Sequence, residues 1–168
     1  MANSTFQGPI RSESTIKTIS KNATTGTITE VTTLGGAPVS LSDGNVTLTN
    51  ATHSGRVLLV PDGGQDNTYT LPAPIAGSMF RFVYAGGAAD ATDALIITPG
   101  NTNFYIGGIT HLDTNADNVT VFSNGSSNSS VQLNVPQAFD ITIIGKDTTN
   151  YQIFGTVTST TVPAFADQ

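Results

Sequence analysis

The sequence predicts an all-β protein that folds into a β-sandwich. Two observations predict this fold class. About nine or ten short runs rich in β-branched and aromatic residues recur at intervals of roughly 8–12 residues and are separated by Gly, Pro, Asn and Asp, which is typical of sandwiches and barrels. No long run of apolar residues with a helical period is visible. Because parallel strands usually need helices to cover them, we expect antiparallel sheets.

The stretch 53–84 is the centre of the predicted domain. In the last of its three strand-like runs, alternation places Phe80, Phe82 and Tyr84 on one face of a strand. A row of aromatic side chains at every second position is much more often a core face than a ligand site. Pro and Gly residues separate the runs and end the strands. The three predicted strands are residues 56–60, 67–71 and 79–84.

Further short runs before and after this stretch complete the predicted sandwich. Each run either alternates polar and apolar residues or is short and apolar, and turn residues bound it. The predicted strands are residues 46–49, 94–98, 104–106, 109–112, 119–122, 131–135, 139–144 and 151–157. We expect an antiparallel jelly-roll-like arrangement, with an immunoglobulin-like sandwich as the second topology.

By composition the chain divides into three parts. Residues 1–38 have widely spaced apolar side chains among Ser, Thr, Gly and Lys, which predicts an extended N-terminal arm followed by a turn-rich linker. Within the arm, residues 27–33 alternate and predict one strand. The alternative is an ordinary disordered terminus. Residues 39–160 form the predicted sandwich domain, and residues 161–168 form a C-terminal tail.

Charge is sparse and unevenly distributed along the chain. Charged residues make up 11% of the sequence, and the formal net charge is −6. Residues 1–21 hold three basic side chains and one acidic one, whereas residues 22–168 hold three basic and eleven acidic ones. Nucleic-acid binding needs a basic surface, so the acidic body argues against it. No stretch approaches the roughly 20 apolar residues of a membrane span, and no secretory signal precedes the domain.

The sequence offers no convincing catalytic site. His53 and His111 lie in unrelated contexts, and Ser54 is not part of the Gly-x-Ser-x-Gly turn of a nucleophile elbow. A Ser-His-Asp triad assembles in space, so no local pattern excludes one. The chain has no cysteine, which excludes disulfides and thiolate metal sites. We therefore predict that the protein is not an enzyme and needs no cofactor.

Asp113, Asn115 and Asp117 have the spacing of the first oxygen ligands of a calcium loop. Asn118 stands where such a loop has glycine, and Asn124 stands where it closes with glutamate. An Asx-rich turn that needs no ion explains the same residues. We favour the turn, so that no metal site is predicted and these three residues are the one weak candidate.

Several segments together resemble the capsid decoration, or cement, proteins of tailed phages, in particular those of marine and cyanobacterial phages. The segments are residues 6–12, 53–62, 68–77, 80–83, 103–113 and 162–168, so the resemblance covers nearly the whole chain. None of them carries chemistry, and their specificity lies in the ensemble. The resemblance implies a jelly-roll structural protein of the virion. It would bind the outer surface of the capsid as a homotrimer and stabilise the mature shell by clamping neighbouring major capsid proteins.

The resemblance also implies a role for the arm, because such proteins are commonly tied to the shell by an N-terminal segment. Apolar side chains of the arm would fill pockets on the capsid, and basic ones would pair with an acidic shell. The predicted capsid-binding residues are Phe6, Pro9, Ile10, Arg11, Ile16, Lys17 and Ile19. The alternative function is a carbohydrate- or receptor-binding head-fibre module that uses exposed loops near Tyr105, Asp113 and Ser126.

Overall fold

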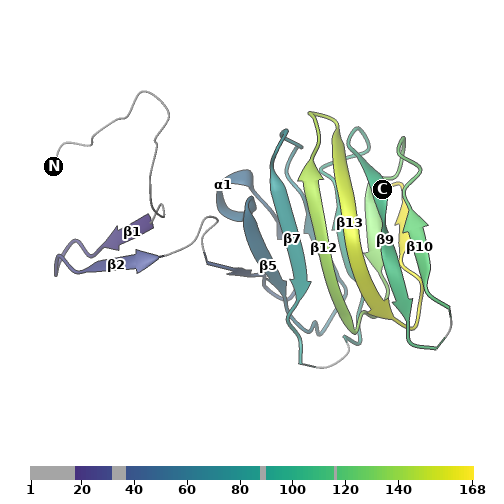
Figure 1. Cartoon of the computed structure of the whole chain (residues 1–168), viewed down its shortest axis with the longest axis horizontal. Coiled ribbons are helices and arrows are strands. Elements are labelled where there is room, and N and C mark those ends of the chain that lie inside the picture. The colour runs from purple at the N-terminus through teal and green to yellow at the C-terminus, as the bar shows by residue number, and fades with distance from the viewer. Residues whose placement is uncertain (1–17, 32–36, 88–89, 116) are drawn as a thin grey trace. The chain divides into compact units, whose positions relative to one another are not determined.

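The computed structural model describes residues 18–31, 37–87, 90–115 and 117–168 (Figure 1). The chain divides into two compact units, residues 1–37 and residues 38–168. In the first unit, β1 (Thr18–Lys21) and β2 (Ile28–Val31) pair antiparallel as a hairpin. The single strand predicted for residues 27–33 is therefore half of a strand pair.

Local hydrogen bonds explain why the hairpin turns where it does. The side chain of Asn22 accepts the backbone amides of Thr24 and Thr25 at 2.8 and 3.0 Å. Gly26 follows with φ +72°, a left-handed conformation that glycine adopts without a steric cost. These are the Asx and glycine features by which a polar segment reverses direction.

The second unit is a sandwich of two mixed sheets, which confirms the all-β sandwich prediction. The larger sheet fills the front of the view in Figure 1. Its seven strands, in spatial order, are β10 (Val119–Phe122), β9 (Phe104–Asp113), β13 (Asn150–Ser159), β12 (Ala138–Gly145), β7 (Met79–Tyr84), β5 (Arg56–Val60) and β3 (Val39–Ser40).

The smaller sheet packs behind it and includes the end of the chain. Its five strands are β14 (Ala164–Ala166), β11 (Ser130–Leu133), β8 (Ala94–Ile97), β6 (Asn67–Thr70) and β4 (Val46–Thr47). The prediction of a separate tail over residues 161–168 is wrong, because β14 pairs with β11. The side chain of Gln168 then donates to the carbonyls of Thr98 and Ser129, each at 2.9 Å.

The prediction of purely antiparallel sheets is wrong. Between the described strands of the sandwich, five pairings are parallel: β3–β5, β5–β7, β4–β6, β6–β8 and β9–β13. From β3 to β8, successive strands alternate between the two sheets. A parallel neighbour needs a crossover of about a dozen residues or more, usually a helix. Here the crossover is a strand of the opposite sheet, so no covering helix is required.

Helix is confined to one turn among the described residues, α1 (Asn50–His53). The Thr49 hydroxyl accepts the Thr52 amide at 3.3 Å and caps the turn. The alternation predicted for residues 131–135 also ends early. Leu133 is the last residue of β11, and Val135 lies beyond it, 40% exposed and with φ +40°.

The core lies between the two sheets and is built from inward-facing aromatic and aliphatic residues. Phe80 and Phe82 are fully buried, as the alternation of that strand predicts, whereas Tyr84 is only partly buried and packs against the core. Three tyrosines, Tyr69, Tyr105 and Tyr151, have no exposed surface. The rings of Tyr105 and Tyr151 lie 6.4 Å apart, within the range of favourable aromatic contacts.

The three buried tyrosine hydroxyls are not equally satisfied. The Tyr105 hydroxyl donates to the Ile96 carbonyl at 3.1 Å, and the Tyr151 hydroxyl donates to the Pro72 carbonyl at 2.8 Å. The Tyr69 hydroxyl makes no hydrogen bond of good geometry among the described residues, and burial raises its pKa although a weaker interaction with the Asn67 side chain acts to lower it. A buried hydroxyl without a partner costs free energy, so the three residues should differ in what their oxygens contribute.

Removing the hydroxyl from Tyr151 or from Tyr69 is therefore expected to affect stability differently. Tyr151→Phe should lower the free energy of unfolding by about 1 kcal/mol, because it breaks a bond to Pro72. Tyr69→Phe should leave it nearly unchanged or raise it, because the hydroxyl that it removes is buried and makes no well-formed hydrogen bond. Urea unfolding of both variants measures the difference. Equal losses in the two would contradict the assignment.

Alkaline pH should destabilise the fold through the same residues. Burial, with the nearby Asp90 and Asp43 carboxylates, raises the pKa of Tyr69 to about 12, and burial also raises the pKa values of Tyr105 and Tyr151. Above the ordinary tyrosine pKa of about 10, the unfolded chain loses protons that the folded chain keeps. Stability should thus be level below pH about 10 and fall as pH rises toward 12, with a shallower fall in Tyr69→Phe. Urea titrations across this range provide the measurement.

Candidate functional site

The side of the seven-stranded sheet that faces away from the core carries several exposed apolar side chains among threonines and other polar residues. We call it the outer face and define it by the residues that alternate with buried ones along these strands. A sheet face in contact with water normally carries polar side chains. Phe154 is 47% exposed, Met79 37% and Phe122 70%. The apolar residues of the outer face are Val57, Leu59, Met79, Val83, Ile106, Leu112, Phe122, Ile144 and Phe154.

One ion pair lies at the centre of the outer face. Arg81 on β7 binds Asp140 on β12 in a two-point arrangement, with Nε to Oδ1 at 2.9 Å and Nη2 to Oδ2 at 2.5 Å. These hydrogen bonds lower the pKa of the Asp140 carboxyl and raise the pKa of the Arg81 guanidinium. Both side chains are nearly half exposed, so the pair adds little to stability. Its effect is to cancel the two charges.

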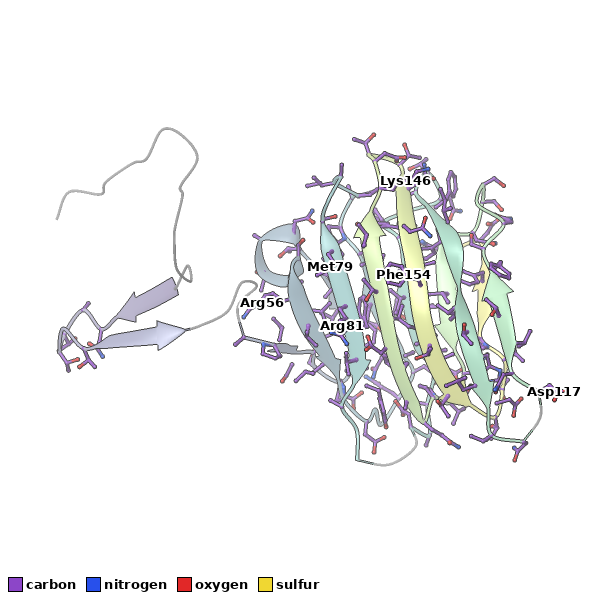
Figure 2. The ribbon with its side chains drawn as sticks, viewed as in Figure 1. Arg56, Met79, Arg81, Asp117, Lys146 and Phe154 are labelled. Carbon is purple, nitrogen blue, oxygen red and sulfur yellow. The ribbon has the colours of Figure 1, made fainter. Side chains whose placement is uncertain are left out.

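A shallow, open hollow of about 540 Å³ surrounds this ion pair. Figure 2 shows Met79 and Arg81 on β7 and Phe154 on β13, with β12 between them. The hollow is lined by apolar side chains, two threonines, the ion pair and the backbone of Gly155. The lining residues are Met79, Arg81, Asp140, Thr142, Ile144, Phe154, Gly155 and Thr156.

Gly155 is required by the backbone that forms this hollow. Its φ is +146°, and a Cβ there would meet the backbone oxygen of Asp140 and the Cα of Ile141 on β12. Only a residue without a side chain lets β12 and β13 approach at this point. The neighbouring Phe154 lies on the outer face, and the absence of a side chain at Gly155 leaves space beside it.

The predicted capsid-binding residues cannot be placed as a site. Phe6, Pro9, Ile10, Arg11, Ile16 and Lys17 lie outside the described residues. Ile19 lies in β1, opposite Glu30 of β2. Their assignment to capsid binding stays a prediction.

The candidate calcium residues form a turn held by their own hydrogen bonds. Asp113 Oδ1 accepts the amide of Asn115 at 2.7 Å, and Asn118 Oδ1 accepts the amide of Asp113 at 3.0 Å. Asp117 lies at the edge of the domain in Figure 2. Within the described part of the chain, no group of three or more His, Asp or Glu side chains could hold a metal ion. The Asx-turn interpretation accounts for the observed bonds.

A Ser–His pair is present, but its geometry does not fit catalysis. His111 and Ser159 are fully buried, and His111 Nε2 lies 2.9 Å from Ser159 Oγ. That hydroxyl donates its proton to the Thr161 carbonyl at 2.7 Å, so the imidazole must donate and Nε2 carries a proton. A general base needs a free lone pair toward the nucleophile, which Nε2 then lacks. The pair instead connects β9 to the end of β13.

Four aspartates in loops of the sandwich also serve the fold. Asp90, which is 3% exposed, accepts the Thr92 amide at 3.1 Å and the Thr92 hydroxyl at 2.8 Å. Asp43 accepts the Gly64 amide at 3.0 Å. Such bonds tie neighbouring loops together and use carboxylate oxygens that an ion would need. The four residues are Asp43, Asp66, Asp90 and Asp93.

Sequence reasoning did not identify the outer face, although a signal was present. Apolar residues stand at consecutive positions in Val57–Val60, Ile143–Ile144 and Ile153–Phe154, where a half-buried strand would alternate. Tyr105, suggested as part of a carbohydrate site, is fully buried and cannot present its ring to a ligand.

Replacing Gly155 with alanine should distort the hollow and destabilise the sandwich. The expected loss of unfolding free energy is about 2 kcal/mol or more, because positive φ and a backbone clash act together. Gly125→Ala is the matched control, since Gly125 also has positive φ (+75°) but no atom within 4 Å of an added Cβ. Thermal unfolding of both should show the larger loss at position 155. A similar loss in the two would mean that the contact with β12 is unimportant.

No protein-family model matches the sequence, and no curated protein matches it. No helix in the described part of the structure is long and apolar enough to cross a membrane.

Proposed function

We propose that this chain is a decoration protein that binds the outer surface of a phage capsid as a homotrimer and stabilises the mature shell. The observation that carries the proposal is the outer face of the sandwich, which exposes Met79, Phe122 and Phe154 and whose central charges, Arg81 and Asp140, pair with each other. Such a surface is suited to protein contact. The resemblance of several segments to phage decoration proteins suggests that the partner is the major capsid protein. The described residues hold no arrangement of groups that favours catalysis over binding.

The proposed mechanism is thermodynamic linkage. A protein that binds only the closed mature lattice lowers the free energy of that lattice by an amount set by its free concentration and its affinity. A trimer presents three equivalent attachment segments, so the second and third bind at a high effective concentration. Three-fold symmetry of the bound protein also matches the local three-fold positions of a capsid lattice.

The N-terminal unit is the proposed attachment segment. Residues 1–21 carry more basic than acidic side chains, whereas the remainder of the chain is strongly acidic. An acidic capsid surface would attract the first and repel the second. The hairpin of β1 and β2 has two strand edges that can pair with a strand of the capsid protein. Residues 1–37 form a compact unit of their own in the division of the chain.

Reversing the charge of the attachment segment should abolish capsid binding without affecting the body. The double variant Arg11→Glu with Lys17→Glu is expected to lose most of its co-sedimentation with capsids that lack decoration protein, at physiological salt. Lys146→Glu is the matched control, because it reverses an exposed charge in the turn after β12. Binding of the control at the level of the unmodified protein is expected.

Two results would contradict the proposal. If the unmodified protein does not co-sediment with capsids at a fixed ratio to capsid protein, the function is wrong. If the double variant binds as well as the unmodified protein, the function can stand but the attachment segment lies elsewhere.

A further inference from the structure

We propose that the hollow at the centre of the outer face binds a segment of an uncharged glycan. The hollow lies over β7, β12 and β13, where Phe154 stands beside the Arg81–Asp140 pair. The sandwich alone would bind such a ligand, which adds to the proposed capsid function without depending on it. The outer face also extends over β9 and β10, so a ligand in the hollow leaves the rest of the face open to a protein partner.

Strand register brings the lining residues together in two rows across the sheet. Arg81 on β7, Thr142 on β12 and Phe154 on β13 lie opposite one another in the first row. Asp140 on β12 and Thr156 on β13 lie opposite each other in the second row. Neighbouring strands are about 4.8 Å apart, so the backbones at Phe154 and Arg81 are about 10 Å apart. A sugar ring fits between an apolar surface at one end of the row and hydrogen-bonding groups at the other.

Phe154 supplies the apolar surface. It is 47% exposed, and the absence of a side chain at Gly155 leaves space beside it. Figure 2 shows Phe154 on β13, in the middle of the sheet. The face of an aromatic ring carries partial negative charge, whereas the C–H groups on the face of a sugar ring carry partial positive charge. The two faces therefore attract each other, and their contact also removes apolar surface from water.

The Arg81–Asp140 pair supplies hydrogen-bonding groups. The bidentate contact uses two of the five N–H groups of a guanidinium and one lone pair of each carboxylate oxygen. Both side chains are nearly half exposed, so a ligand can reach their remaining groups. A hydroxyl group both donates and accepts. Adjacent hydroxyls of one sugar can therefore donate to Asp140 and accept from Arg81 without separating the pair.

The charge of the hollow disfavours ionic ligands. Among its lining residues, Arg81 and Asp140 alone are ionisable, and each neutralises the other. A phosphate or carboxylate ligand is held best by an unpaired cation. A wholly apolar ligand would cover the ion pair and two threonine hydroxyls without satisfying them. An apolar lining with a few convergent polar groups, in a volume of about 540 Å³, is suited to a neutral ligand with both kinds of surface.

The position of the hollow in the sheet disfavours a peptide ligand. β7, β12 and β13 each have a paired strand on both sides, so an extended peptide finds no strand edge there to pair with. A peptide helix needs a continuous apolar groove. The ion pair and the threonines interrupt the apolar lining of this hollow. A sugar needs neither a strand edge nor a long groove.

The test uses NMR spectroscopy of the full-length protein with a panel of uncharged trisaccharides built from glucose, galactose, mannose or N-acetylglucosamine. At least one should receive saturation transfer from the protein and shift the amide resonances of Thr142, Gly155 and Thr156. The expected Kd is about 1 mM, because an open hollow covers only part of its ligand. N-Acetylneuraminic acid, which is anionic, should shift none of these resonances.

Two variants and a matched control locate the site. Phe154→Ala is expected to weaken binding at least tenfold, and so is the double variant Arg81→Ala with Asp140→Ala, which removes both charges together. Phe122→Ala makes the same change at a residue that is 70% exposed on β10 and does not line the hollow. This control should bind like the unmodified protein. Circular dichroism and thermal unfolding should show an intact sandwich in all three.

Two results would overturn the glycan site. One is the absence of any shift around the hollow with every trisaccharide of the panel at about 10 mM, ten times the expected Kd. The other is equal binding by Phe154→Ala and Phe122→Ala.

Capsid co-sedimentation of the same proteins separates this site from the proposed function. If no trisaccharide binds and Phe154→Ala no longer pellets with capsids, the hollow belongs to the capsid contact, which overturns the glycan site and preserves the function. If the unmodified protein binds a trisaccharide in the hollow but ignores capsids, the function is wrong and the glycan site stands.

Discussion

The rest of the structure depends on the packing of two sheets around one shared core. From β3 to β8 the chain passes from one sheet to the other at every step, so none of these strands pairs with its neighbour in sequence. Each strand is held by a parallel partner about 20 residues away or more, and by side chains of the opposite sheet. Because these contacts join residues far apart in sequence, several loops must close, at a cost in entropy, before the contacts form. This favours cooperative folding.

Polar chemistry in this protein is largely used to complete that core and its loops. His111 and Ser159 join two strands, Asp90 ties its loop, and Gln168 fixes the last residue to the smaller sheet. Groups that resemble catalytic or metal-binding ones in sequence have backbone amides, carbonyls or hydroxyls as partners. The sandwich domain is therefore expected to contact other molecules through its surface, and its most distinctive surface is the outer face.

The two units of the chain differ in charge. Residues 1–21 carry more basic than acidic side chains, whereas residues 22–168 are acidic. An acidic partner surface would therefore attract the beginning of the chain more than the sandwich.

The sequence by itself determined that the protein is all-β, where most strands lie and which side chains face the core, because alternation and turn residues act locally. Phe80, Phe82, Ile141 and Ile143 follow from that pattern and are buried. Strand order and direction were decided by tertiary structure, since a crossover through the opposite sheet leaves no local signature. The pairing of Arg81 with Asp140, 59 residues apart, and the hollow over Gly155 exist only once β7, β12 and β13 lie side by side. Local patterns in the sequence can show that a strand is apolar on both sides. They do not show which strands become neighbours in the sheet, so the candidate site could not be predicted from the sequence.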